Sequence, residues 1–254
     1  IVMIAICGVI CSADSWVEIE DWAKAKEDLL KEFMDLPNGI PSHDTFARVF
    51  SRLDPKKFQE CFGKWLHTLR LAPAGEVIAI DGKTLRGSFD RAVGQSPLHC
   101  VSAWATSRGV SLGSVSVCDK SNEITAIPQL LELLEVQGCV VTLDAMGCQK
   151  NIASKIREKK ADYVLALKGN QGNLHKGIRA FFETELESGF KECSHTYSET
   201  EDKGHGRIEV RRCWSTNNIG WLKQEEDWKD LCSINMVEST RSIVDPATKA
   251  LKST

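Results

Sequence analysis

Two aspartates, Asp81 and Asp144, are the residues whose types and positions best indicate chemistry. Each ends a strongly apolar run, "VIAID" and "VVTLD", and each is followed by small residues. If both runs are central strands of one sheet, the two carboxylates can lie side by side, where they repel each other unless a cation lies between them. Oxygen ligands suit Mg²⁺ or Mn²⁺, and two such ions about 3.5–4 Å apart promote phosphodiester chemistry. We therefore predict a metal site there; for either aspartate alone, a turn or helix cap is the simpler interpretation.

The elements that must position these aspartates can be outlined from hydrophobic periodicity. Apolar residues at helical spacing predict helices over most of residues 1–70, with Ser42 as the expected cap of the helix that follows it. From residue 76 onward the pattern predicts three strands, a helix, a strand, a helix, a strand and a helix. This order suits an α/β sheet of mixed direction and is the order of ribonuclease H-like folds. We expect a helical N-terminal region over residues 1–72 and the α/β domain over residues 73–254, with a β-rich segment near 193–216.

The composition excludes several classes of protein. The 254 residues are 42% hydrophobic and 26% charged, as in an ordinary globular protein. The net charge of -3 argues against attraction of the whole molecule to nucleic acid, but it leaves room for local basic faces. The cysteines form no CxxC pair and no zinc-site spacing. The apolar start "IVMIAICGVIC" is shorter than the roughly 20 residues that cross a bilayer, and no positive region precedes it, so we expect no membrane partner.

Seven long stretches, spread in order over nearly the whole chain, carry a family resemblance. They are "GIPSHDTFARVFSRLDP", "AIDGKTLRGS", "LHCVSAWA", "EITAIPQLLELL", "TLDAMGCQKNIASKI", "DYVLALKGNQGNLH" and "HGRIEVRRCW". With these stretches the chain resembles the DDE insertion-sequence transposases, most closely the H-repeat-associated group. A single "DGK" would carry little weight, whereas seven matches in one order are highly specific.

The resemblance implies a ribonuclease H-like catalytic core preceded by a helical region. Members of the family cut DNA at the ends of a mobile element and join the freed 3′-hydroxyl to a target. The first two catalytic aspartates of the family map onto Asp81 and Asp144, with Mg²⁺ or Mn²⁺ as the cofactor. The implied partners are element-end and target DNA and, in a homodimer on DNA, a second copy of the chain. The implied location is the bacterial cytoplasm, at the nucleoid.

Basic residues near these motifs are candidates for contacts to DNA phosphates. The candidates are Lys83, Arg86, Lys168, His205, Arg207 and Arg211, joined by Arg212 in the same basic run. Lys83 and Arg86 follow the first aspartate closely, and Lys168 lies in "LKGNQ" after a predicted strand. The alternatives are surface ion pairs for these residues and, in the "LKGNQ" loop, a helix cap made by Asn170 or Asn173.

The third carboxylate of the family is a glutamate on a late helix, in a stretch that resembles "HWxIEN". No such stretch occurs in this sequence, so we expect a chain that is truncated at both ends and inactive in strand transfer. Glu209 is a poor substitute, because "RIEVRRCW" alternates and predicts a strand. Two alternatives stay open: a non-catalytic relic that binds DNA or a partner, and a ribonuclease H-like metal-dependent nuclease without a joining step.

Overall fold

The computed structural model describes residues 1–68, 72–85, 88, 97–117, 122–204, 207–222, 227–244 and 251–253. The chain divides into two compact units, Ile1–Trp65 and Leu66–Thr254. None of the helices in the described ranges is long and apolar enough to cross a membrane.

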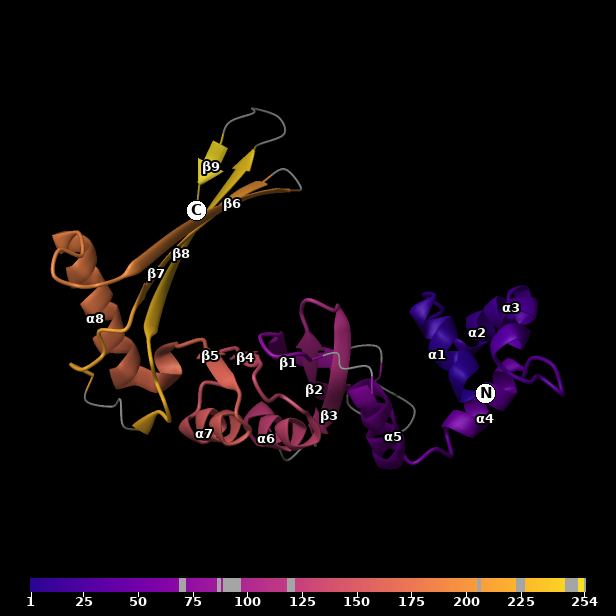
Figure 1. Ribbon diagram of the computed structural model, residues 1–254. Helices are drawn as coiled ribbons and strands as arrows, with labels where there is room; N and C mark the ends of the chain where they lie inside the picture. Colours follow the sequence, from indigo (N-terminus) through magenta and orange to yellow (C-terminus); the bar gives the residue numbers. More distant parts are fainter. Residues whose placement is uncertain are drawn as a thin grey trace. The chain divides into compact units, whose positions relative to one another are not determined.

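The first unit is helical (Figure 1). Its helices are α1 (Val2–Ile10), α2 (Trp16–Ala25), α3 (Glu27–Phe33), α4 (His43–Phe50) and the beginning of α5 (Pro55–Thr68). One residue from each of the first four helices shows how they share an apolar core: Ile4, Ile19, Leu30 and Phe46 are all buried. The helical periodicity of the sequence is confirmed here, because the apolar faces of these helices meet in one cluster.

Ser42 lies at the N-cap position of α4, but its side chain makes no capping hydrogen bond to the backbone. Its hydroxyl lies 3.2 Å from the Thr45 hydroxyl instead. The carboxylate of Glu20, on α2, accepts the hydrogen bond from the backbone N–H of His43 at 2.6 Å. The predicted cap by the Ser42 side chain is therefore wrong. The Glu20 carboxylate, from a neighbouring helix, accepts the hydrogen bond from the first backbone N–H of α4 instead.

The second unit contains a five-stranded mixed sheet. Its strands are β1 (Val77–Leu85), β2 (Leu98–Ala105), β3 (Val110–Val117), β4 (Val140–Leu143) and β5 (Asp162–Leu165). They lie in the order β3-β2-β1-β4-β5. The β3-β2 and β2-β1 pairs are antiparallel, whereas β1-β4 and β4-β5 are parallel. This confirms the predicted mixed sheet and the strand and helix order of a ribonuclease H-like fold.

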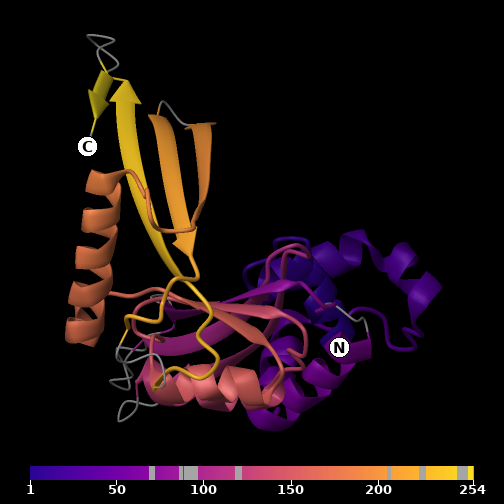
Figure 2. The same ribbon diagram turned by 60° about the vertical axis from the view of Figure 1, so that its left-hand side comes forward.

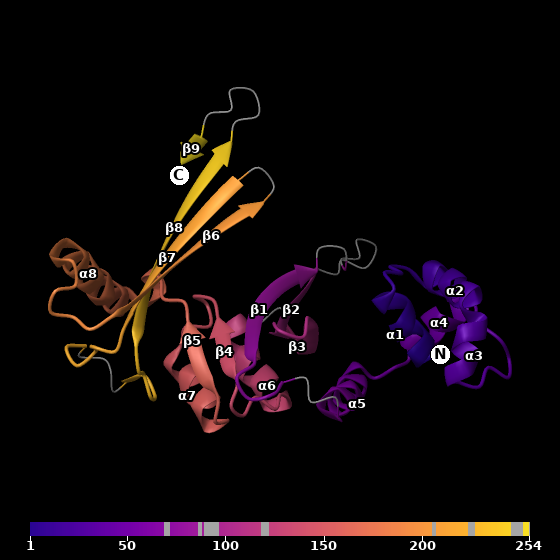
Figure 3. The same ribbon diagram turned by 45° about the horizontal axis from the view of Figure 1, so that its top comes forward.

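Two helices, α6 (Glu123–Leu133) and α7 (Lys150–Glu158), lie along this sheet (Figures 1 and 3). Their apolar faces form one core with the strands, in which Ile78 and Ile80 of β1, Leu130 of α6 and Ile156 of α7 are buried. Alternate residues of β1 therefore point into this core, and the residues between them belong to the opposite face of the sheet.

A second sheet follows in the same unit. A short 3₁₀ turn, η2 (Gly169–Gln171), leads into the long helix α8 (Gly172–Ser188). The strands β6 (Thr196–Gly204), β7 (Arg207–Thr216), β8 (Ile234–Val244) and β9 (Leu251–Ser253) form an antiparallel sheet in this order. Helix α8 lies beside it (Figure 2), and Phe182 of α8 is buried in one cluster with Ile234 of β8.

Candidate active site

Asp81 and Asp144 are brought together by the register of two parallel strands. The pairing of β1 with β4 ends at Ile80 opposite Leu143. Asp81 is the next residue of β1, Asp144 directly follows the last residue of β4, and neighbouring strands lie about 4.8 Å apart. Both aspartates are exposed. Figure 3 shows β1 and β4 side by side in the sheet.

The two carboxylates also share a face of the sheet. Ile80 and Leu143 are buried in the core under α6 and α7, so the residues that follow them belong to the other face by alternation. Lys83, two residues after Asp81, lies on that same face and is exposed. The carboxylate pair and the cationic side chain of Lys83 therefore lie on the face of the sheet that α6 and α7 do not cover. We call this the open face.

Strand β1 does not end at Asp81, which corrects the prediction from the sequence. The strand continues to Leu85, and Asp81 is paired with Ser102 of β2. The apolar run stops at Ile80 because β1 has a neighbouring strand on both sides only up to that residue. Beyond it, β2 alone supplies the backbone hydrogen bonds. Asp81 thus marks the point where β1 leaves β4, not the end of a strand.

The side chain of Asp144 is held by the turn that follows it. Its Oδ1 accepts hydrogen bonds from the backbone N–H of Met146 at 3.0 Å and of Gly147 at 3.3 Å. Within the described ranges, no donor reaches its Oδ2 and no cation pairs with either aspartate. The turn therefore accounts for one oxygen of Asp144 and leaves the second one available as a ligand.

A chain of hydrogen bonds next to Gly82, on the face of β1 opposite to Asp81, was not predicted from the sequence. Glu123 Oε1 lies 2.8 Å from Nε2 of His99, whose Nδ1 lies 2.9 Å from the Thr84 hydroxyl. A Cβ at Gly82 would lie only 2.1 Å from Glu123 Oε1. The glycine after Asp81 thus lets a carboxylate approach the strand from the core side. The glycine of the "DG" pair could have indicated this contact from the sequence, because a glycine inside a strand often marks a position where another group approaches the backbone closely.

No third ligand joins the two aspartates in the part of the chain that the structure describes, where no group of three His, Cys, Asp or Glu side chains could hold a metal ion. Glu209 lies on β7 of the second sheet, as the strand prediction requires. Its Oε1 lies 3.0 Å from Arg211 and 3.5 Å from Arg241. Burial alone would raise the pKa of Glu209, but the attraction of these two arginines, with hydrogen bonds from Ser239 and Arg241, leaves that pKa below its usual value.

The remaining DNA-contact candidates among the described residues lie directly before η2 and on β7. Lys168 is exposed directly before η2. Arg212 is held between Glu199 at 2.9 Å and Glu238 at 3.2 Å, whereas Arg207 is exposed and forms no ion pair with a described residue. Arg86 and His205 lie outside the described residues.

Asn170 and Asn173 do not cap α8. The N-cap residue is Gln171, and no side chain makes a capping hydrogen bond there. Asn170 donates instead to the backbone carbonyl of Ala145 at 2.7 Å, and Gln171 donates to that of Cys148 at 2.9 Å. Both amides therefore hold η2 against the segment that follows Asp144.

Comparisons with known proteins agree on one family. A family model described as "Transposase DDE domain" matches residues 72–250, and a second, described as "DDE_Tnp_1-associated", matches residues 1–66. "Putative transposase YncI" of Escherichia coli O157:H7 is 48% identical over 242 residues, which cover 95% of this chain and 61% of that protein. "H repeat-associated putative transposase YhhI" of Escherichia coli K12 is 41% identical over 247 residues, which cover 96% of this chain and 64% of that protein.

A solved structure, a cryo-EM structure of a piggyBac transposase synaptic complex with hairpin DNA, is only distantly similar. It has a TM-score of 0.33 and 11% identity, and the match covers 73% of this chain and 44% of that one. The chain spans less than two thirds of the length of the YncI and YhhI relatives named above.

Proposed function

The chain belongs to the DDE transposase family, and we propose that its second unit carries out metal-dependent DNA strand cleavage at the ends of an insertion sequence and joins the cleaved ends only weakly, because the described residues supply no third carboxylate. The observation that carries the proposal is the placement of Asp81 and Asp144 next to each other on the open face of the sheet. Two carboxylates without a cationic partner repel each other, and a shared divalent cation removes that repulsion.

The residues present fit such an ion. Mg²⁺ is commonly bound by one or two carboxylates, with waters and substrate phosphates completing its octahedral shell. Asp144 offers its Oδ2, since Oδ1 is occupied by two backbone N–H groups, and Asp81 offers an exposed carboxylate. When bound, Mg²⁺ or Mn²⁺ would polarise the phosphodiester and lower the pKa of an attacking water.

The protein groups around the aspartates would position the DNA. Lys83 lies on the same face as Asp81, two residues further along the strand, where its ammonium group can contact a backbone phosphate. Lys168 is the corresponding candidate near Asp144, because η2, which it precedes, is tied to the carbonyl of Ala145. Arg86, His205, Arg207 and Arg211 complete the proposed contacts to DNA. A homodimer on DNA in the bacterial cytoplasm is part of the same proposal.

Two other functions compete with this one, and a specific observation favours each. The lack of a third ligand among the described residues favours a relic that binds DNA or a partner without cutting it. The carboxylate pair by itself favours a metal-dependent nuclease that cuts without joining.

The experiment that separates them uses supercoiled plasmid and a labelled element-end duplex, each with Mg²⁺ or Mn²⁺. The proposed function requires metal-dependent nicking that disappears in Asp81→Asn and Asp144→Asn. Joining of the labelled 3′ end separates a transposase from a nuclease. DNA binding without any nicking would support the relic instead.

A further inference from the structure

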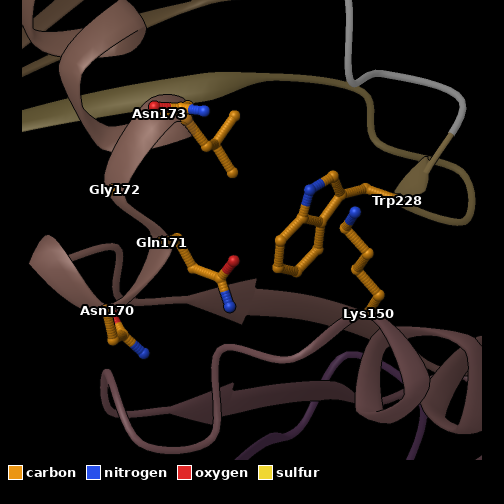
Figure 4. Close-up of a pocket in the computed structure, with 7 residues that line it drawn as sticks. Lys150, Asn170, Gln171, Gly172, Asn173 and Trp228 are labelled. Atoms are coloured by element: carbon orange, nitrogen blue, oxygen red, sulfur yellow. The ribbon is translucent and has the colours of Figure 1, made fainter.

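A pocket of about 190 Å³ lies at the N-terminus of α8 (Figure 4). Residues 170–174 form one wall, and Lys150 of α7 and Trp228 complete it. Neither Asp81 nor Asp144 is among the described residues that line the pocket, and the proposed function leaves it unused.

The first turn of α8 faces this pocket without a cap. The helix has 17 residues, no capping side chain and no acidic residue in its first turn. The first backbone N–H groups of an α-helix have no partner within the helix, and the helix dipole makes this end positive. The side chain of Gln171, at the N-cap position, is directed instead to the carbonyl of Cys148. The N–H groups of this first turn that the carbonyls of the preceding turn η2 do not take up are therefore available to an anion.

Trp228 gives independent evidence for a ligand. Its side chain is buried, with only 4% of the residue exposed. Its indole Nε1 finds no hydrogen-bond partner in the described part of the chain, although buried indole N–H groups usually have one. Figure 4 shows this nitrogen directed across the pocket toward the beginning of α8, where Gly172 and Asn173 lie. An indole N–H can only donate, so the missing partner must be an acceptor.

Lys150 adds a positive charge to the rim. Its Nζ lies 2.7 Å from Oδ2 of Asp227, and both side chains are about half exposed. The ammonium group has three donors, so the ion pair leaves others for a ligand. Among the described residues that line the pocket there is no Asp or Glu. The lining thus presents backbone, indole and ammonium donors together, which suits a compact anion with several acceptor oxygens.

We propose that this pocket binds a phosphate group. The phosphate has two possible sources, a phosphodiester of the DNA backbone or free inorganic phosphate, and the DNA source rests on the proposed function. In that case the pocket holds a strand close to the metal-binding aspartates, because Asn170 at its edge is bonded to Ala145, the residue after Asp144. The binding of the phosphate group itself does not depend on any cleavage activity.

The test follows the indole N–H signals of the full chain in ¹H–¹⁵N spectra while inorganic phosphate is added. Trp228→Phe identifies the signal of the pocket. Trp221→Phe identifies a matched control, since the Trp221 indole already donates to the Asn218 carbonyl at 2.9 Å. Sodium chloride at equal ionic strength serves as the blank. We expect phosphate to move the Trp228 signal saturably and to leave the Trp221 signal in place.

Two charge variants make the test sharper. Lys150→Gln should weaken phosphate binding, and Asp227→Asn should strengthen it, each by about two- to fivefold, as expected for half-exposed charges. A Trp228 signal that does not respond to phosphate, or that responds equally to chloride, would overturn the proposal. So would a loss of affinity in Asp227→Asn, which would assign the Lys150–Asp227 pair to folding instead.

The source of the phosphate is decided by adding duplex DNA. A shift of the Trp228 signal by the duplex that excess inorganic phosphate reverses supports the backbone source. A response to phosphate but not to the duplex supports the phosphate site and rejects DNA as the source. Measuring nicking and the titration on the parent chain separates the two proposals: a Trp228 shift without nicking refutes only the proposed activity, and nicking without a shift refutes only the pocket. The shift should persist in Asp81→Asn/Asp144→Asn, because phosphate binding does not depend on cleavage.

Discussion

Asp81 lies beside Asp144 because β1 and β4 run parallel, with Ile80 opposite Leu143 as their last pair. The two residues are far apart in the sequence, and the parallel register brings their positions next to each other, one residue beyond that last pair. Within the described ranges, neither has a cationic partner that would offset their mutual repulsion. This relationship makes the effect of a metal ion on stability a direct test of the site.

Asp81→Asn should have opposite effects in the absence and in the presence of metal. Without metal, the variant should be equal to or slightly more stable than the parent, by about 0–1 kcal/mol, because a like-charge contact is removed. With Mg²⁺ or Mn²⁺, the parent should gain stability and the variant should not. Any metal-dependent nicking should fall by at least about 100-fold, since the lost charge stabilisation amounts to several kcal/mol. Thermal unfolding in EDTA and in Mg²⁺ measures the first two effects; Asp202→Asn, on the exposed strand β6, is the control.

Gly82→Ala tests the close approach of Glu123. The new Cβ would lie 2.1 Å from Glu123 Oε1, so the carboxylate must turn away and lose its hydrogen bond to His99. We expect a loss of about 1 kcal/mol in the free energy of unfolding, measured by urea denaturation. In a Glu123→Ala background the same change should become neutral or stabilising, because alanine costs less backbone entropy in a strand than glycine. Equal costs in both backgrounds would contradict this account.

The N-terminal unit should show a pH window set by Glu20 and His43. Glu20 accepts from the backbone N–H of His43 at 2.6 Å, and its carboxylate lies 2.5 Å from Lys24. The hydrogen bond from Lys24 and those from His43 lower the pKa of Glu20 to about 2. The hydrogen bond to Glu20 raises the pKa of His43 above its usual 6.5. The stabilisation from Glu20 is therefore present above pH 4.5 and lost toward pH 2, and that from charged His43 is present below pH 6.5 and lost as the pH rises through the folded-state pKa.

The difference in Tm between the parent and Glu20→Gln should thus be largest between about pH 4.5 and 6.5 and shrink on both sides. Tryptophan fluorescence reports the melting, since Trp16 and Trp22 pack on this core. Asp21→Asn, exposed on the same helix, should show no such window. A difference in Tm that does not change with pH would mean that the interaction is not ionic.

The salt dependence of DNA binding should distinguish Arg207 from Arg212. Arg212 already pairs with Glu199 and Glu238, whereas Arg207 is exposed and forms no ion pair with a described residue. If the second sheet contacts DNA, Arg207→Ala should reduce the slope of log K against log salt by about one unit. Arg212→Ala should change the slope less, because its charge is compensated. The reverse order would show that the ion pairs of Arg212 open on binding.

The comparison of sequence and structure shows what pattern alone can predict. The alternation of apolar residues predicted β1 and β4, and the order of elements predicted a mixed sheet, because both depend on local periodicity. The end of β1 was placed at Asp81, since exposed residues that pair with only one neighbouring strand carry no apolar signal. Glu123 was missed because its contact with Gly82 joins a helix to a strand across the core. Trp228 was missed because the lack of a hydrogen-bond partner for its buried indole N–H depends on packing, which residue spacing in the sequence does not show.

Strand transfer by this chain should be weak, and Glu209 should not contribute to it. Two aspartates can hold one shared ion, but fixing a second ion requires a further carboxylate. No third ligand joins them in the described part of the chain, and Glu209 is occupied by Arg211 and Arg241 on another sheet. Each 1.36 kcal/mol of lost transition-state stabilisation lowers the rate about tenfold, so a loosely held second ion removes detectable joining.

The measurement compares joining of a labelled element end by this chain with that by a version extended to the length of its relatives. Glu209→Gln should lower the Tm of the chain, because it breaks two ion pairs, and should leave metal-dependent nicking unchanged. Joining by this chain at the rate of the extended one, abolished by Glu209→Gln, would instead identify Glu209 as the third carboxylate and require the second sheet to approach the aspartates on DNA.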